Sequence, residues 1–236
     1  TGVLEEALLE DAESVHLAVA AGATAGQPTW VAAVDRHWLR GAFPRAYLAR
    51  SEADSLAWRG NFVQAFLERD LPQLGITIPA DTLGRFWSML AHYHGQVWSA
   101  ADPARSLGVS QPTIRRYLDI LTGAFMIRQL QPWFEKFGKR LVKAPKIYFR
   151  DTGLLHALLG LRSREELLSH PKLGASWEGF ALEEVLRMTG AERDAYFYGT
   201  HGGAELDLMV LRHGRRYGFE FKFQNAPRTS HSMHVA

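Results

Sequence analysis

The chain has 236 residues, of which 47% are hydrophobic and 22% charged, and its formal net charge is +2. These values are ordinary for a globular protein, and the length suits one or two domains with real cores. It has no cysteine, which excludes disulfides and thiolate metal sites. No apolar run approaches the ~20 residues of a membrane span, and no basic-then-apolar signal pattern opens the chain. We therefore expect a cytoplasmic protein without a membrane partner.

Residues 1–95 predict a helical region. Apolar side chains recur near the helical period between residues 3 and 21. Ser51 has the character of an N-cap, because acidic residues and then an apolar stripe follow it. Pro72 and Gly75 should end that helix. Asp81 or Thr82 should cap the next helix, which carries an apolar stripe to a stop at Gly95.

Residues 96–150 predict a winged helix-turn-helix. A short helix ends near Leu107, a turn follows at 108–110, and Ser110 caps a second helix from Gln111 to about Thr122. Strands at 125–130 and 146–149 flank a basic loop. The second helix of such a unit enters the major groove of DNA. The candidate nucleic-acid contacts are Gln111, Thr113, Arg115, Arg116, Lys136, Lys139, Arg140 and Lys143.

Charge supports the same interpretation. Residues 101–150 hold 10 Lys/Arg against 3 Asp/Glu, a balance of +7. A basic island of this kind is the electrostatic footprint of a nucleic-acid surface. Two alternatives stay open: a basic face that is simply solvated, and a winged domain that binds protein instead of DNA.

Residues 151–236 predict a third unit, a helix followed by a three-stranded antiparallel meander. The helix covers 177–188 after a break at 171–176 and places Glu178 in its first turn. A strand at 196–198 leads to a hairpin of 204–211 and 216–223, with the turn at 212–215.

The hairpin gathers charge on one face. Alternation puts Leu206, Leu208 and Val210 on one face of their strand. The other face of the hairpin then carries Glu205, Asp207, Glu220 and Lys222. A turn centred on His213-Gly214 makes paired residue numbers sum to 427, so Asp207 should lie across from Glu220, and Glu205 across from Lys222.

Two carboxylates placed directly opposite each other destabilise a sheet. A hard divalent cation between them reverses that interaction. The pattern therefore predicts a site in which Asp207 and Glu220 hold Mg²⁺, Glu178 and Lys222 complete the catalytic set, and a metal-bound water attacks a phosphodiester. The alternative is an exposed amphipathic hairpin in which Lys222 pairs with Glu205 or Glu220.

Six stretches carry a resemblance to a known family. They read LRGAFPR (39–45), a run at 58–71 that ends in LERDL, SLGVS (106–110), KAPKIYFRDTGL (143–154), WEGF (177–180) and GAELD (203–207). Together they resemble the C-terminal part of predicted prokaryotic AAA+ superfamily ATPases, which join a P-loop ATPase to a domain of unknown function. The resemblance implies a winged helix-turn-helix followed by a restriction-endonuclease-like core, with Glu178, Asp207, Glu220 and Lys222 at the acidic and lysine positions of that nuclease superfamily.

The expected fold class is therefore α+β. A helical region (1–95, next to the ATPase), a winged helix-turn-helix (96–150) and a partial nuclease-like unit (151–236, ending before the family's last helix and strand) follow one another. We expect a nucleic-acid-binding fragment whose nuclease-like unit takes Mg²⁺. The alternative is a non-enzymatic protein-interaction module that regulates an ATPase core. No P-loop occurs, so ATP belongs to a longer parent protein. The sequence leaves open whether this chain is an enzyme and whether it forms an oligomer.

Overall fold

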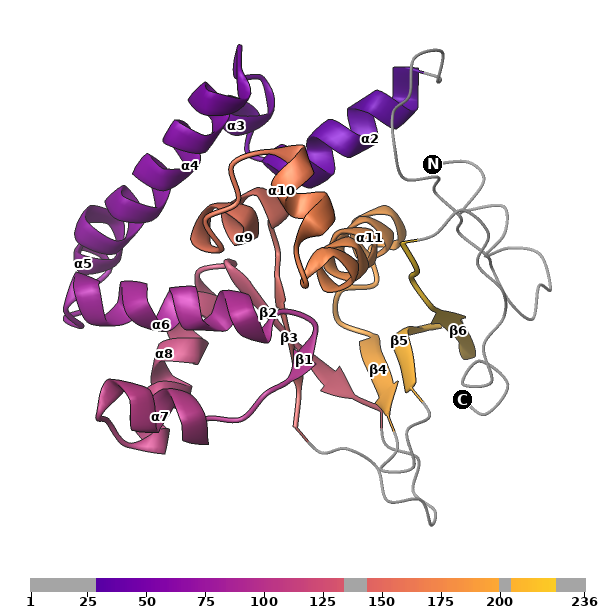
Figure 1. Ribbon diagram of the computed structural model, residues 1–236. Coiled ribbons are helices and arrows are strands. Elements are labelled where there is room, and N and C mark those ends of the chain that lie inside the picture. The colour runs from indigo at the N-terminus through magenta and orange to yellow at the C-terminus, as the bar shows by residue number, and fades with distance from the viewer. Residues whose placement is uncertain (1–28, 134–143, 200–204, 224–236) are drawn as a thin grey trace.

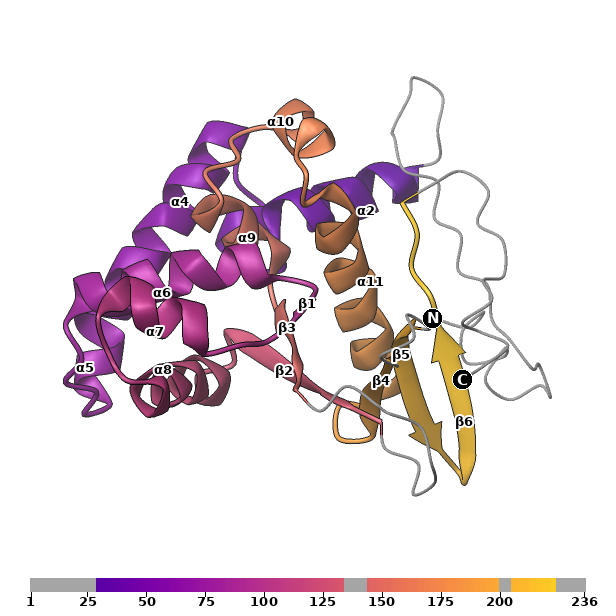
Figure 2. The ribbon, with the colours of Figure 1, turned by 60° about the horizontal axis from the view of Figure 1, so that its bottom comes forward.

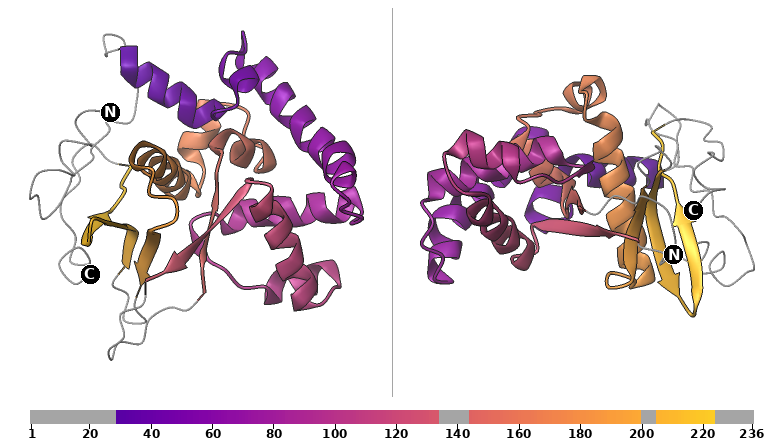
Figure 3. Two further views of the ribbon diagram at one scale, coloured as in Figure 1. Left: turned by 180° about the vertical axis from the view of Figure 1, so that it is seen from behind. Right: turned by 90° about the horizontal axis from the view of Figure 1, so that it is seen from below.

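The computed structural model describes residues 29–133, 144–199 and 205–223 (Figure 1). The helix expected at 3–21 lies outside these residues. The helices between residues 52 and 123 gather at one end of the molecule, and the hairpin of the last two strands lies at the other end (Figures 2 and 3). Within the described part of the chain, no helix combines the length and apolarity that crossing a bilayer requires.

The N-terminal region is helical, as the sequence predicts. Its elements are α2 (Thr29–Arg40), α3 (Pro44–Tyr47), α4 (Glu52–Ala65), η1 (Phe66–Asp70), α5 (Leu71–Gln73) and α6 (Ala80–Tyr93). The cap at Ser51 is confirmed, because its hydroxyl accepts a hydrogen bond from the backbone N–H of Asp54. The cap expected at Asp81 or Thr82 is wrong. The N-cap of helix α6 is Pro79, two residues before Asp81, and the fixed φ of −54° at Pro79 already suits the start of a helix.

The order helix, turn, helix and two antiparallel strands is confirmed in the next segment. Helix α7 (Ala101–Leu107) and helix α8 (Gln111–Gly123) flank a turn in which Gly108 has a φ of +66°. The Ser110 hydroxyl accepts from Thr113 N, as expected of the cap. Strands β2 (Ile127–Pro132) and β3 (Lys146–Phe149) pair antiparallel. Sequence reasoning missed β1 (Gln96–Val97), which is too short to show a periodic pattern and is defined by its pairing with β3.

The last segment contains α9 (Thr152–Leu158), α10 (Arg164–Ser169), α11 (Leu173–Thr189), β4 (Ala195–Gly199), β5 (Glu205–Arg212) and β6 (Arg215–Phe219). The break expected at 171–176 is wrong for its last four residues, because α11 starts at Leu173. Tertiary contacts stabilise this first turn: buried Ser176 accepts a hydrogen bond from the Trp38 indole at 3.0 Å. Glu178 therefore lies in the second turn of its helix.

Among the described residues, six strands form one sheet in the order β1-β3-β2-β4-β5-β6. The expected antiparallel meander of β4, β5 and β6 is confirmed. Strand β2 pairs parallel with β4 through Gln131 and Tyr196. One sheet thus runs from the wing strands into the last unit, and α11 packs on it with a shared core that includes Leu130, Leu182 and Leu208.

The hairpin register is confirmed where β5 and β6 pair. Leu208 lies opposite Phe219 and Arg212 opposite Arg215, so the numbers sum to 427. The prediction that Leu206 shares a face with Leu208 and Val210 is wrong. The pairing of β5 with β4 shifts register between Tyr196 and Tyr198, and a bulge of this kind turns one side chain to the other face. Leu206 accordingly packs with Met209 and Tyr198 in a separate cluster.

Two stretches that are far apart in the sequence pack together beside this sheet. The backbone N–H of Ala42 donates to the Asp151 carboxylate at 2.7 Å, and the Thr152 hydroxyl donates to the Trp38 carbonyl at 2.6 Å. Gly41 has a φ of +82°, and a Cβ placed there would lie 2.1 Å from an Asp151 oxygen. Both stretches belong to the resemblance described above, and their contacts position α2 against α9.

Candidate functional site

A carboxylate–lysine cluster lies where β3, α11 and β5 meet, and we define it as Lys146, Tyr148, Glu178, Glu205 and Asp207. The Lys146 ammonium is 3.4 Å from Glu178 Oε1 and also forms an ion pair with Glu205. The Tyr148 hydroxyl donates a hydrogen bond to the same Glu178 oxygen. The side chain of Lys146 is 4% exposed and that of Glu178 is 17% exposed. Four of its five side chains are therefore largely buried, whereas the side chain of Glu205 is 51% exposed.

Asp207 is the most perturbed acid of this cluster. It is 7% exposed, and its Oδ2 accepts a hydrogen bond from the backbone N–H of Phe221 at 2.8 Å. Burial, assisted by the negative charge of Glu178, raises the pKa of Asp207 to about 7. The Phe221 N–H and the ammonium groups of Lys146 and Lys222 act in the opposite direction. Asp207 is thus a buried carboxyl that exchanges its proton near neutral pH.

Glu220 and Lys222 follow directly after β6 and form an ion pair with each other at 2.8 Å. This contact is one of the two pairings that the sequence left open for Lys222. Burial lowers the pKa of Lys222, but the hydrogen bond that Lys222 donates to Glu220 and the charges of Asp207, Glu220 and Glu178 raise it above its ordinary value. Lys222 therefore faces the cluster, although half of its side chain is exposed.

The four predicted catalytic residues, Glu178, Asp207, Glu220 and Lys222, therefore lie close enough for their charges to interact. The remaining residue of the predicted charged face has a partner that the sequence did not predict. Glu205 pairs with Lys146 of β3 instead of standing against Lys222. Sequence reasoning missed Lys146 and Tyr148. Their signal was available: the two polar residues alternate on an otherwise apolar strand, and alternation places them on one face. Ile147 and Phe149 belong instead to the hydrophobic core that also contains Leu90 of α6 and Leu118 of α8.

The donor set offers a test of the magnesium prediction. Mg²⁺ requires oxygen ligands in near-octahedral geometry. Within the residues that the structure describes, no group of three or more histidine and carboxylate side chains converges closely enough to hold a metal ion. Instead, the protein's own donors engage these carboxylates: Lys146 for Glu178 and Glu205, the Phe221 N–H for Asp207, and Lys222 for Glu220. The expected site draws only two side chains, Asp207 and Glu220, so the prediction of Mg²⁺ stays a prediction.

The second candidate surface is the outer face of α8. Gln111, Arg115 and Arg116 are exposed, as a groove-reading helix requires. Thr113 is half-buried and its hydroxyl lies 2.8 Å from the Ser110 hydroxyl, so it belongs to the helix cap. The inward face is apolar and buried, with Ile114 and Leu118 among its residues. The expected wing contacts Lys136, Lys139, Arg140 and Lys143 lie outside the described residues.

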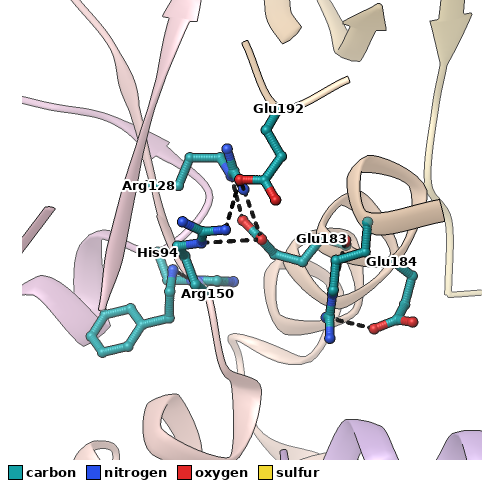
Figure 4. A network of polar contacts seen from close by, with 8 residues as sticks. His94, Arg128, Arg150, Glu183, Glu184 and Glu192 are labelled. Carbon is teal, nitrogen blue, oxygen red and sulfur yellow. Dashed lines mark hydrogen bonds and ion pairs between the residues drawn. The ribbon is translucent and has the colours of Figure 1, made fainter. Parts of the chain in front are cut away.

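Several basic side chains of the island are neutralised by carboxylates of the protein itself. Arg105 pairs with Asp102 at 2.5 Å, and Lys146 belongs to the carboxylate–lysine cluster. Figure 4 shows Arg128 and Arg150 converging on Glu183 of α11 and on Glu192. Arg128 donates to both oxygens of Glu183, at 2.5 and 2.9 Å, and Arg150 lies 2.8 Å from Glu192.

Comparison with known proteins identifies two family models along the chain. A domain of unknown function, DUF8612, matches residues 31–165, and a second one, DUF4143, matches residues 173–235. Two uncharacterized proteins, Rv2008c of Mycobacterium tuberculosis and Mb2031c of Mycobacterium bovis, are each 56% identical over 204 residues. That alignment covers 86% of this chain and 46% of each relative, so the chain spans about half the length of these relatives.

One solved structure aligns with 59% of this chain and 96% of its own: the crystal structure of transcriptional regulator PA3341, at 23% identity and a TM-score of 0.25. A TM-score of this size does not establish a shared fold. The first family model alone covers more than half of the chain, and the mycobacterial relatives agree with this sequence along most of its length. The chain therefore belongs to the family defined by the domain of unknown function DUF8612.

Proposed function

We propose that this chain is a nucleic-acid-binding module in which α8 enters the major groove of duplex DNA. One observation carries the proposal. Arg115 and Arg116 on the exposed face of α8 make no ion pair within the described residues, whereas Arg105, Arg128, Lys146 and Arg150 are neutralised by carboxylates. Positive charge is thus retained on the one helix that the helix-turn-helix geometry presents to DNA.

The positions on α8 suggest separate roles. Gln111 and Arg115 are four residues apart and share a face of the helix. Gln and Arg are the side chains that pair with the edges of adenine and guanine in the major groove. Arg116 lies about 100° further around the helix and is placed to contact backbone phosphate. We therefore assign base reading to Gln111 and Arg115, and backbone positioning to Arg116.

Salt dependence tests this proposal directly. We expect fluorescence anisotropy to show binding to a labelled mixed-sequence duplex that weakens as salt increases, because phosphate contacts release counterions. Replacing Arg115 and Arg116 by alanine should weaken binding and reduce the slope of log K against log salt by about 1, because Arg116 alone is assigned a phosphate contact. The matched control is Arg105→Ala, which removes an exposed arginine that already pairs with Asp102 and should leave the slope nearly unchanged.

Two outcomes would overturn it. Absence of binding at low salt would favour the alternative, a protein-interaction module that regulates an ATPase core. An unchanged slope in the Arg115→Ala/Arg116→Ala variant would place the DNA contact elsewhere on the chain. Circular dichroism of both variants checks that the fold is kept.

We also propose that the module works within a longer protein that carries an ATPase. The resemblance to the C-terminal part of AAA+ superfamily ATPases supports this, and the relatives leave room for such a module because the alignment covers 46% of their length. ATP would then bind to that other module. ATP hydrolysis by the full-length protein, lost when the lysine of its P-loop is replaced, tests the idea. A full-length reading frame without a P-loop would refute it.

A second candidate function is phosphodiester hydrolysis at the carboxylate–lysine cluster. The observation that favours it is the raised pKa of Asp207, because a carboxyl with a pKa near 7 can act as a general acid or base at neutral pH. Lys222 adds a cation that can face a phosphate. Cleavage of supercoiled plasmid by the full-length protein should require Asp207 and stop in an Asp207→Asn variant. Equal cleavage by both proteins would remove Asp207 from the mechanism, and EDTA would show whether a divalent cation takes part.

A further inference from the structure

We infer that Lys146 is the resident counter-cation of the carboxylate–lysine cluster, occupying the position from which a divalent cation would otherwise bridge Glu178 and Glu205. The sequence pointed to a metal on the hairpin alone. In the structure, Lys146 of β3, a strand of the wing, instead places its positive charge against Glu178 of α11 and Glu205 of β5.

The contacts of Lys146 are those of a bound cation. Its ammonium touches Glu178 and Glu205 directly, and Asp207 is close enough for their charges to interact. Its side chain is 4% exposed, so the ammonium depends on these carboxylates for its contacts, although the Glu205 side chain also reaches solvent. The ammonium also lies 5.5 Å from the centre of the Phe197 ring, a cation–π arrangement that favours positive charge at this point.

Glu178 is held in place for this interaction. The Tyr148 hydroxyl donates to the oxygen that Lys146 contacts. A close approach fixes the neighbouring backbone as well: Gly179 lies against the buried His94 ring, and a Cβ at Gly179 would lie 2.3 Å from His94 Nε2. Glu178 thus has little freedom to turn away from Lys146 and to assemble a separate site.

The Lys146 ammonium compensates the negative charge of the neighbouring carboxylates. Glu178 and Glu205 both contact one lysine, and Asp207 interacts with its charge at longer range. A carboxylate left uncompensated is costly where it is buried, as Glu178 largely is. Removing the ammonium should therefore leave two carboxylates, Glu178 and Glu205, that one hard divalent cation can bridge. A cation that enters the intact protein must displace Lys146 first, and its apparent affinity is reduced accordingly. The inference concerns cation binding alone and requires neither DNA binding nor cleavage.

The test uses Mn²⁺, which prefers the same oxygen ligands as Mg²⁺, in isothermal titration calorimetry with the 236-residue chain. Lys146→Met should bind Mn²⁺ at least tenfold more tightly than the original chain. Adding Glu178→Gln to that variant should abolish the gain. Lys146→Arg keeps the charge and should behave like the original chain. The matched control is Lys172→Met, because the Lys172 charge also acts on Glu178 but Lys172 hydrogen-bonds the His94 carbonyl; its Mn²⁺ affinity should change less than threefold.

A second measurement guards against loss of folding. If Lys146→Met is unstable, Mn²⁺ should raise its melting temperature, and this rise should be larger than for the original chain. Equal or weaker Mn²⁺ binding by a folded Lys146→Met variant would overturn the inference, as would an unstable variant that Mn²⁺ does not stabilise. Tight Mn²⁺ binding by the original chain that depends on Asp207 and Glu220 would overturn it too, and would restore the site expected from the sequence.

Discussion

Glu183→Gln offers a sharp test of how the wing strands are joined to α11. The Glu183 carboxylate lies at the centre of the network in Figure 4. Arg128 of β2 contacts both of its oxygens, and Arg150, directly after β3, lies 3.6 Å away. The side chains of Glu183 and Arg128 are 4% and 10% exposed. The substitution therefore removes the main countercharge of a buried guanidinium.

The expected cost follows from these contacts. Breaking a buried ion pair by removing one partner typically costs 3–5 kcal/mol, because the remaining charge is left uncompensated. Arg128 keeps a weaker contact with the half-exposed Glu192 at 3.5 Å, and glutamine still accepts one hydrogen bond. We therefore expect the low end, about 3 kcal/mol. For a chain of this size that loss lowers the melting temperature by roughly 6–12 °C.

Urea denaturation followed by tryptophan fluorescence measures the loss. The matched control is Glu184→Gln, one residue further along α11, whose carboxylate pairs with Arg187 at 2.6 Å on a more exposed side of the helix. Surface pairs of this kind contribute less than about 1 kcal/mol. The double variant Arg128→Leu/Glu183→Leu should recover much of the lost stability, since no buried charge is then left alone. A loss in Glu183→Gln no larger than in Glu184→Gln would refute the reasoning.

Three further substitutions test individual features. Burial raises the pKa of Asp207 to about 7, above the ~3.9 of an unfolded chain, so the stability that its proton contributes is present below about pH 4 and is lost as the pH rises to 7. Asp207→Asn, which can still accept from Phe221 N–H, should therefore be more stable than the original chain by on the order of 4 kcal/mol at pH 8 and little different at pH 4; denaturation curves with parallel pH profiles would contradict this. His213→Asn should stabilise the hairpin by about 0.5 kcal/mol, because His213 and Gly214 have φ values of 52° and 76° and asparagine tolerates that turn better; a lower melting temperature would count against it. Gly41→Ala should destabilise the fold by more than about 2 kcal/mol, because its Cβ meets Asp151 at a φ of +82°; a thermal melt that stays unchanged would show that the loop can shift at little cost.

Local signals predicted much of the fold. The N-caps at Ser51 and Ser110, the order helix, turn, helix and the register of the hairpin are each set by residues that are near one another in the sequence, and the structure confirms them. The failures arose where distant contacts decided. Helix α11 begins earlier than its sequence indicates because Ser176 binds Trp38, and Leu206 changes face because β5 bulges against β4.

The candidate site divides in the same way. The sequence alone identified Glu178, Asp207, Glu220 and Lys222, since strand alternation and one tight turn bring the last three together. It did not reveal which cation faces which carboxylate. Lys146 is 32 residues from Glu178 along the chain. Their ion pair exists because α11 packs on the sheet to which β3 belongs. Burial is likewise a property of the packed core, so only the tertiary structure decided that the pKa of Asp207 lies near 7. It also decided that Arg115 and Arg116 form no ion pair with any other residue that the structure describes.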